Sequence, residues 1–171
     1  LQNLVLSTLD SMGITDAKYK KEDLNNYDKY IDASMEYAEQ LSPYFTKFAD
    51  TVSDGIRKRK NTTGIYAHAM AVITNVEDRK LIEGLSASEI FEVASRRQPR
   101  ILKGNLKTVL QKIEEIQVDE DGRGLILSYN KSEEKIFIID RQLLFYRIYR
   151  TINWPWETLI AESKEENYMV E

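Results

Sequence analysis

Basic side chains gather in one stretch of this sequence, residues 96–112, with no acidic residue between them. They are Arg96, Arg97, Arg100, Lys103, Lys107 and Lys112. Lysine and arginine bind phosphate oxygens, and asparagine or glutamine can pair with adenine in the major groove of DNA. Asn105, Thr108 and Gln111 lie among these cations. The stretch therefore has side chains suited to contacting a nucleic acid, and a solvated helix face is the alternative interpretation.

Two short helices are expected to position these side chains. Ser86 and Glu89 form an S-x-x-E capping box, which predicts a helix that starts just after Ser86. Pro99 cannot continue that helix, so the chain should turn there. Asn105 is a good N-cap and predicts the start of a second helix with apolar residues at 3.6 spacing. Its apolar side consists of Leu106, Val109, Leu110 and Ile113.

The elements around this pair complete a recognisable order. Residues 65–76 are apolar on nearly every side and predict a buried helix, which is followed by a polar exit over 77–84. Two β-rich runs, 123–130 and 135–140, are separated by the polar link 131–134 and predict a hairpin. Three helices followed by a two-stranded hairpin is the order of a winged helix-turn-helix, with the hairpin as the wing.

The segment from about residue 65 to about residue 150 thus resembles the winged-helix superfamily. Its second strand leads into the pattern I-I-D-x-x-L-L-F-Y-R, which is similar to the C-terminal winged-helix domains of some large P-loop ATPases. The matching residues are Ile138, Ile139, Asp140, Leu143, Leu144, Phe145, Tyr146 and Arg147. Those proteins resolve DNA, act in replication, or serve in bacterial defence and mobile elements. No G-x-x-x-x-G-K-[ST] motif occurs, so the ATPase itself is absent from this sequence.

The resemblance implies that the second helix of the pair enters the major groove and that the connector meets the DNA backbone. The hairpin would add Arg123 at its base and Lys131 at its tip. The residues expected to face DNA are Arg96, Arg97, Arg100, Lys103, Asn105, Lys107, Thr108, Gln111, Lys112, Arg123 and Lys131. Acidic neighbours weigh against binding unless they point away, because they repel phosphate. They are Glu114, Glu115, Asp119, Glu120, Asp121, Glu133 and Glu134.

Aromatic residues form a second candidate contact surface. One long helix is predicted over residues 23–60, kinked or split near Pro43. Tyr30, Tyr37 and Tyr44 recur every seven residues along it. Packing against a neighbouring helix is one interpretation. A docking surface for a partner or a second copy is the other, and Trp154 and Trp156 would suit that use.

The fold class expected from these patterns is mainly α (α+β). A helical region over 1–62, which begins with a short amphipathic helix closed by Gly13, precedes a winged-helix domain over 63–163 with C-terminal helices. Asp140 is expected to cap a helix that runs to residue 152, a final short helix covers 157–162, and residues 164–171 form an acidic tail.

Composition limits the other possibilities. The 171 residues are 42% hydrophobic and 30% charged, as in a globular protein. The net charge of −4 gives no general attraction to nucleic acid, so binding must rest on a local basic patch. There is no cysteine, no apolar run of membrane-spanning length and no signal-peptide pattern, so a cytoplasmic protein without a membrane span is expected.

Catalytic and metal-binding patterns are not found. His68 is the sole histidine and lies in the apolar run 65–76, where a buried core residue is expected. A single histidine completes neither a His-based metal site nor a Ser-His-Asp triad. The carboxylates at 114–115 and 119–121 lack EF-hand spacing, and Glu133-Glu134-Lys135 has no partner acid at nuclease spacing. We therefore expect no enzyme, metal site or cofactor.

Two functional hypotheses remain. The first is a module that binds duplex DNA, either in transcription regulation or within a larger DNA-processing or defence protein. The second is a winged helix that docks proteins or forms a homodimer in a larger assembly. Because the sequence starts at Leu1 and not at Met, a missing further domain is also part of both hypotheses.

Overall fold

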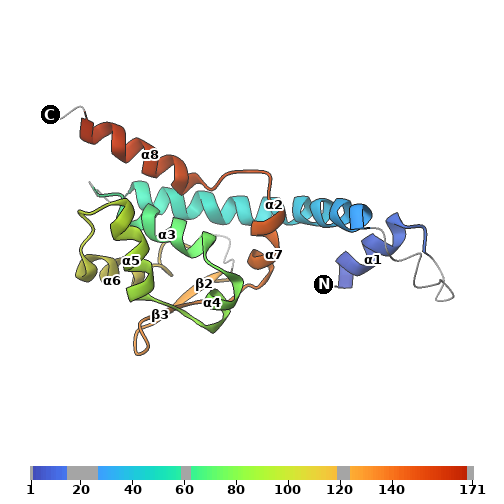
Figure 1. Ribbon diagram of the computed structural model, residues 1–171, viewed down its shortest axis with the longest axis horizontal. Coiled ribbons are helices and arrows are strands. Elements are labelled where there is room, and N and C mark those ends of the chain that lie inside the picture. The colour runs from blue at the N-terminus through green and yellow to red at the C-terminus, as the bar shows by residue number, and fades with distance from the viewer. Residues whose placement is uncertain (1, 15–26, 59–62, 119–123, 169–171) are drawn as a thin grey trace.

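The computed structural model describes residues 2–14, 27–58, 63–118 and 124–168 (Figure 1). Over these residues the fold is mainly helical with a small three-stranded antiparallel sheet, which agrees with the expected α+β class. The elements in order are α1 Gln2–Ser11, α2 Tyr27–Arg57, α3 Ile65–Asn75, α4 Asp78–Glu83, β1 Leu85–Ser86, α5 Ala87–Arg97, α6 Lys103–Leu110, β2 Leu127–Asn130, β3 Lys135–Ile138, α7 Gln142–Tyr149 and α8 Pro155–Tyr168.

Helix α2 runs through most of the length of the molecule, with α8 along one side and the sheet on the other (Figure 1). It continues without a break through Pro43, so the predicted split does not occur. Ala38, Phe45 and Phe48 are buried on both sides of the proline and hold the helix together, while Pro43 itself is exposed. The carbonyl that loses its partner to the proline can therefore be hydrated. The predicted ends of this helix, 23–26 and 59–60, lie outside the described residues.

Helix α1 ends as its sequence predicts. Gly13 has a φ of +69°, a left-handed conformation that glycine adopts without strain. The N–H of Ile14 donates to the carbonyl of Leu9 at 2.9 Å, as in a Schellman cap. The helix contacts the N-terminal half of α2. The polar loop predicted over 14–22 lies almost entirely outside the described residues.

Helix α3 is the buried helix predicted from its apolar run. Every residue from Ile65 to Thr74 is buried, His68 included. Helices α2, α5, α6 and α8 all contact it, so one hydrophobic core extends from α2 to α8. The long helix thus shares its core with the segment that follows it.

The polar exit predicted after α3 is wrong in part, because most of these residues form α4, and the short strand β1 follows directly after them. Leu81 anchors α4 in the core. Gly84 then turns the chain with a φ of +95°, and a Cβ at this position would lie 2.5 Å from the ring of Phe137. The turn therefore requires glycine both for its backbone angle and for the space it leaves.

The predicted hairpin is present and belongs to a larger sheet. Strands β2 and β3 pair antiparallel around the four-residue turn 131–134. Leu127 lies opposite Ile138, and Tyr129 opposite Ile136. Strand β1 pairs with the other edge of β3, giving the order β1-β3-β2. The hairpin is thereby fixed to the start of α5, and its strands are shorter than the predicted runs.

The I-I-D-x-x-L-L-F-Y-R pattern mainly holds the fold together. The carboxylate of Asp140 accepts the N–H of Gln142, the first residue of α7, at 2.9 Å. The N-cap is Arg141, however, so the helix begins one residue later than predicted. Arg147 is mostly buried, forms an ion pair with Asp78, and links α7 to α4. Helix α7 ends at Tyr149 instead of residue 152, whereas α8 extends to Tyr168, well beyond the predicted end at 162.

Five rings from α2, α7 and α8 and the link before α8 form a buried aromatic seam. Its members are Phe45, Phe48, Tyr146, Trp154 and Trp156. Phe45 stacks on Tyr146 with ring centroids 4.7 Å apart, and Trp154 stacks on Trp156 at 4.8 Å. The indole N–H of Trp156 donates to the hydroxyl of Thr74 at 3.2 Å. The seam joins the long helix to the C-terminal helices.

The predicted aromatic docking surface must be corrected accordingly. Trp154 and Trp156 are 3% and 0% exposed, so neither can contact a partner in this fold. Tyr37 packs edge-on against Phe145, and Tyr44 packs against Phe45. Of the five aromatic residues predicted for that surface, Tyr30 alone is exposed. The heptad of tyrosines thus serves mainly to pack helices of the same chain.

In the described part of the chain, no helix combines the length and the apolar character needed to cross a membrane.

Candidate nucleic-acid interface

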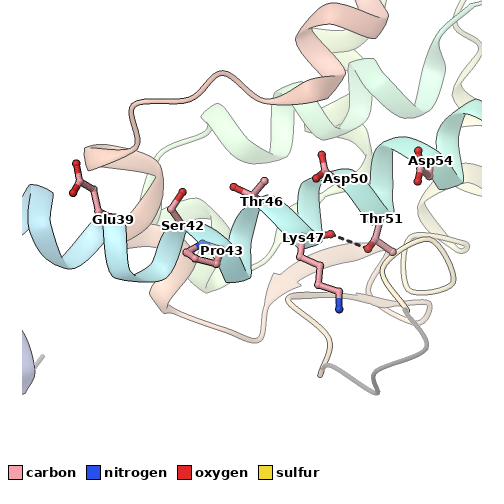
Figure 2. Close-up of a pocket in the computed structure, with 8 residues that line it drawn as sticks. All are labelled: Glu39, Ser42, Pro43, Thr46, Lys47, Asp50, Thr51 and Asp54. Carbon is pink, nitrogen blue, oxygen red and sulfur yellow. Dashed lines mark hydrogen bonds between the residues drawn. The ribbon is translucent and has the colours of Figure 1, made fainter.

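A hollow on the polar face of α2 is poorly suited to an anionic ligand. Its lining comes from successive turns of this one helix (Figure 2). The lining residues are Glu39, Ser42, Pro43, Thr46, Lys47, Asp50, Thr51 and Asp54. Three carboxylates against one lysine would repel phosphate.

Among the described residues, no group of three or more His, Asp or Glu side chains is placed to hold a metal.

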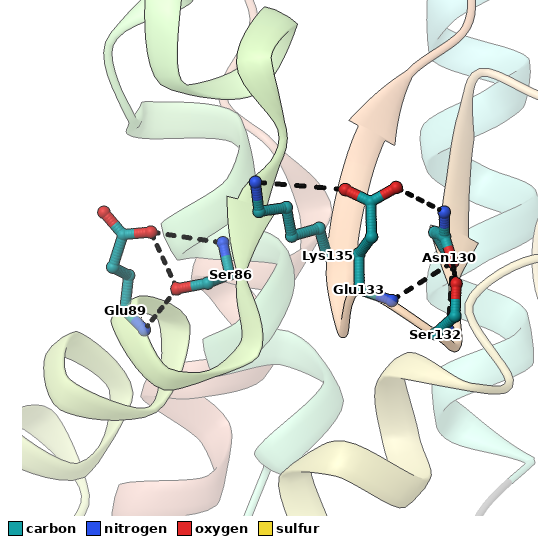
Figure 3. A network of polar contacts seen from close by, with 6 residues as sticks. All are labelled: Ser86, Glu89, Asn130, Ser132, Glu133 and Lys135. Atoms are coloured by element: carbon teal, nitrogen blue, oxygen red, sulfur yellow. Dashed lines mark hydrogen bonds and ion pairs between the residues drawn. The ribbon is translucent and has the colours of Figure 1, made fainter.

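The expected capping box at the start of α5 is present. The hydroxyl of Ser86 accepts the N–H of Glu89 at 3.2 Å, and the Glu89 carboxylate accepts the N–H of Ser86 at 3.2 Å (Figure 3). Lys80 donates to the same carboxylate at 2.9 Å. Together, the hydrogen bonds from Lys80 and Ser86 lower the pKa of Glu89 from 4.5 to about 2. The box fixes where α5 begins and so where its basic last turn lies.

The start of α6 differs from the prediction. The helix begins at Lys103, with Leu102 as its N-cap and no capping side chain, so Asn105 lies inside the first turn. Ile101 and Leu106 are both buried. Burying these two residues sets the position of the helix, and this packing outweighs the preference of asparagine for the cap. Leu106, Val109, Leu110 and Ile113 form the buried side, as predicted.

Four basic side chains lie at the junction of α5 and α6, and we call them the connector cations. They are Arg96, Arg97, Arg100 and Lys103. All four are exposed, and within the described part of the chain Arg96, Arg97 and Lys103 form no ion pair. The exposed face of α6 adds Asn105, Thr108 and Gln111, all of which can form hydrogen bonds. Contacts between α5 and α6 bring these two sets onto one part of the molecule.

The remaining predicted DNA contacts are placed apart from the connector. Lys112 is exposed in the turn after α6, at the opposite end of that helix from Lys103. Lys131 is exposed in the hairpin turn. Arg123 lies outside the described residues. The structure therefore groups the four connector cations and places Lys112 and Lys131 on other parts of the chain.

Lys107 is not the unpaired cation that the sequence suggested. Its ammonium group donates to the carboxylate of Glu134, which lies at the end of the hairpin turn. This hydrogen bond raises the pKa of Lys107. The helical period alone could not reveal the pair, because its partners lie 27 positions apart and meet only when the hairpin folds onto α6.

Several acidic neighbours are engaged within the chain. Glu114 accepts hydrogen bonds from the hydroxyl of Ser128 at 2.7 Å and the N–H of Tyr129 at 3.0 Å. Glu133 accepts from the amide of Asn130 at 2.9 Å, and Lys135 lies 4.0 Å from it (Figure 3). The carboxylates predicted at 119–121 lie outside the described residues. The repulsion expected from the described acids is thus partly offset by their own partners.

Gln117 holds the end of the α6 segment against β2, and sequence analysis did not single it out. It is buried, and its amide group donates to the carbonyls of Ile113 at 2.8 Å and Leu127 at 3.0 Å. Its carbonyl oxygen accepts the N–H groups of Ile126 at 3.2 Å and Leu127 at 2.8 Å. The one signal in the sequence was that Gln117 is a lone polar residue beside apolar neighbours. That pattern does not tell whether the side chain is exposed at the surface or buried and hydrogen-bonded to the backbone, as it is here.

Comparisons with protein-family models, with curated proteins and with solved structures found no match to this chain. Any functional argument therefore depends on the geometry described above.

Proposed function

We propose that this chain is a winged-helix module that binds duplex DNA. In this proposal α3, α5 and α6 are the three helices and the β2–β3 hairpin is the wing. The element order α3-α4-β1-α5-α6-β2-β3 and the sheet order β1-β3-β2 support it, because a winged helix places its first strand between the helices and beside the wing. Helix α4 is an addition to that order. The module would be regulatory or would belong to a larger DNA-processing or defence protein.

The observation that carries the proposal is the exposure of the connector cations. Arg96, Arg97 and Lys103 have no ion-pair partner among the described residues, although the chain as a whole is acidic. Nearby carboxylates such as Glu114 and Glu134 form hydrogen bonds within the chain instead. Exposed cations concentrated at one site attract phosphate even when the net charge is negative.

The proposed binding mode follows from the placement of these groups. Helix α6 would lie in the major groove, with Asn105, Thr108 and Gln111 toward the bases. The connector cations would contact the phosphate backbone at the N-terminal end of the same helix. Backbone contacts would position the module, and the polar side chains of α6 would provide what sequence preference it has.

The test is binding to a random-sequence duplex, followed by fluorescence anisotropy at low and near-physiological salt. We expect the logarithm of the affinity to fall linearly with the logarithm of salt concentration. Neutralising two connector cations, Arg97→Gln with Lys103→Gln, should weaken binding and reduce that slope by about two. Lys47→Gln with Arg141→Gln removes the same charge from α2 and the start of α7, and it should leave the slope unchanged.

Absence of binding at low salt would refute the proposal and favour protein docking. One observation supports that second candidate: Ile139, Ile148 and Ile152 are more than half exposed at and beside α7. Exposed apolar side chains of this kind often mark contact surfaces when they are contiguous. Sedimentation of the wild type and of Ile148→Ser would then show whether a homodimer forms through this region.

A further inference from the structure

The carboxylate of Glu134 is held in place against α6 by its backbone. Glu134 is the one non-glycine residue with a positive φ in the described part of the chain, at +54°. Its carbonyl accepts the N–H of Ala87, the first residue of α5, at 2.8 Å. This left-handed conformation is uncommon for residues other than glycine, asparagine and aspartate. The turn therefore fixes the direction from which Glu134 reaches Lys107.

A buried hydroxyl without a partner lies on β2, the strand that leads into the same hairpin turn. Tyr129 on β2 is 7% exposed, and its hydroxyl has no hydrogen-bond partner among the described residues. Its pKa is raised, first by burial and then by the negative charge of Glu134, while Lys107 acts in the opposite direction. Both charges are thus near enough to influence the phenol. A buried polar group without a partner is unfavourable, and such groups often mark a place that a ligand completes.

An ordinary surface ion pair does not account for this arrangement. The Lys107 and Glu134 side chains are 44% and 46% exposed, and pairs of that kind contribute little to stability. Such a pair needs neither a left-handed residue nor an adjoining unsatisfied hydroxyl. Both features are explained if the position is built for an anion other than Glu134.

We propose that Lys107 and Tyr129 form a binding position for one phosphate of the DNA backbone, and that Glu134 occupies this position in the free protein. The proposal rests on the DNA-binding function inferred above. A carboxylate presents two oxygens to Lys107, much as a phosphodiester presents its two non-bridging oxygens. In the complex, the phosphate would accept hydrogen bonds from the Lys107 ammonium and the Tyr129 hydroxyl, and the Glu134 side chain would turn to solvent.

This arrangement would make the wing a competitor for DNA. A duplex that contacts only the connector cations would leave the Lys107–Glu134 pair closed and would bind weakly. A duplex that seats α6 fully in the groove would replace Glu134 with phosphate and gain two donors. Because Glu134 is anchored to α5 through Ala87, the exchange would also couple the wing to the helix pair.

The first test compares Glu134→Gln with Glu133→Gln in the full chain, by anisotropy with a random-sequence duplex. The two variants remove the same charge from adjacent turn residues, but Glu133 contacts Asn130 and Lys135 and not α6. We expect Glu134→Gln to bind about threefold more tightly than Glu133→Gln, the scale of a surface ion pair that no longer has to be broken. Its salt slope should match that of Glu133→Gln, because Lys107 contacts a phosphate in both complexes.

The second test removes the hydroxyl with Tyr129→Phe. Loss of one hydrogen bond to phosphate should weaken binding about fivefold in the wild type and in Glu134→Gln. Stability in urea should stay the same or rise, because the hydroxyl has no partner in the free protein. Tyr66→Phe removes the same atom from a buried tyrosine of α3 and should leave the affinity unchanged.

The outcomes separate this inference from the function on which it rests. If the wild type binds with a steep salt dependence but Glu134→Gln binds no more tightly than Glu133→Gln, the inference is wrong and the function stands. Wild-type affinity in Tyr129→Phe would also overturn it. If neither the wild type nor Glu134→Gln binds duplex at low salt, both the function and the inference are wrong.

Discussion

Trp154 and Trp156 of the aromatic seam and the connector cations were both predicted to lie on contact surfaces, but the tryptophans are buried and the connector cations are exposed. The seam lies inside the molecule and joins α2 to α7 and α8, with Trp156 fully buried. The connector cations lie outside it, at the junction of α5 and α6. One region helps to hold the chain together, and the other is exposed to solvent.

The difference comes from what each side chain requires. An aromatic ring gains free energy from any apolar neighbour, so its spacing does not tell whether the neighbour belongs to the same chain. A guanidinium or ammonium group is very costly to bury without a partner. A run of cations without nearby acids therefore predicts an exposed surface more reliably than a run of aromatics predicts a docking surface.

The largest effect should come from removing a ring of the seam. Trp156→Ala deletes an indole that packs against Phe48 and Trp154 and donates to Thr74. Large-to-small changes at such sites cost about 3–5 kcal/mol, because the cavity collapses only in part. Urea denaturation followed by circular dichroism should therefore show a greatly lowered midpoint, since domains of this kind are stable by only about 5–15 kcal/mol.

The matched experiment on the other region is the Arg97→Gln and Lys103→Gln double variant. Its stability should lie within about 0.5 kcal/mol of the wild type, as is usual for exposed positions. A loss below 1 kcal/mol for Trp156→Ala, about the scale of a peripheral contact, would break the comparison. So would a large loss for the double variant, which would give the cations a structural role.

The sequence predicts the parts of this fold that depend on near neighbours. The Ser86–Glu89 capping box, the Gly13 helix end and the β2–β3 hairpin are all confirmed, and each is specified within a few residues. The buried side of α6 is confirmed for the same reason, because a helical period places residues three and four apart on one face. These features need no knowledge of which distant segments meet.

What the sequence could not predict depends on distant contacts. The strand β1 is two residues long and is defined by its pairing with β3, so no local pattern marks it. Asn105 was expected to be the N-cap of α6, but the burial of Ile101 places the N-cap at Leu102, three residues earlier. Lys107 was expected to be unpaired, and the pair it forms with Glu134 depends on how the hairpin folds back. The sequence therefore predicted an exposed basic surface, but it could not predict that Lys107 is paired.

The second prediction concerns Gly84, where the chain passes from the helical core to β1. Gly84→Ala introduces a Cβ that would lie 2.5 Å from the Phe137 ring, at a φ of +95°. Backbone strain of this kind costs about 1–3 kcal/mol, and the ring must also move. Denaturation should show a loss smaller than that of Trp156→Ala and larger than that of the connector variant.

The Gly84→Ala variant sharpens the comparison between the aromatic seam and the connector cations. Gly84 leads into β1, the strand that holds the hairpin to α5. If the hairpin loosens, hydrogen exchange should increase in β1 and β3 before it increases in α3. Gly104→Ala is a suitable control, since a Cβ there meets no atom within 4 Å. It should be neutral or slightly stabilising, because alanine is the better helix former.

A loss of stability smaller than those of Trp156→Ala and Gly84→Ala is expected from removing a surface charge, and it should depend on pH. The pKa of Glu89 is about 2 in the folded protein against 4.5 for the free side chain. Its charge therefore stabilises the fold above pH 4.5, and this contribution is lost as the pH falls from about 4.5 toward 2. Glu89→Gln should cost about 0.5–1 kcal/mol near neutral pH, because solvent screens a carboxylate whose side chain is 43% exposed.

Denaturation of the wild type and of Glu89→Gln at pH 6, 4 and 3 checks this, and the difference between the two stabilities should narrow as the pH falls. Lys80→Gln removes the largest cause of the lowered pKa but leaves the Ser86 hydrogen bonds, so its pH dependence should be intermediate. A constant gap between wild type and Glu89→Gln would show that only the uncharged part of the cap matters. A gap that narrows with falling pH would show instead that the charge of Glu89 stabilises the fold weakly and reversibly. A ring of the seam, by contrast, should stabilise it strongly at every pH.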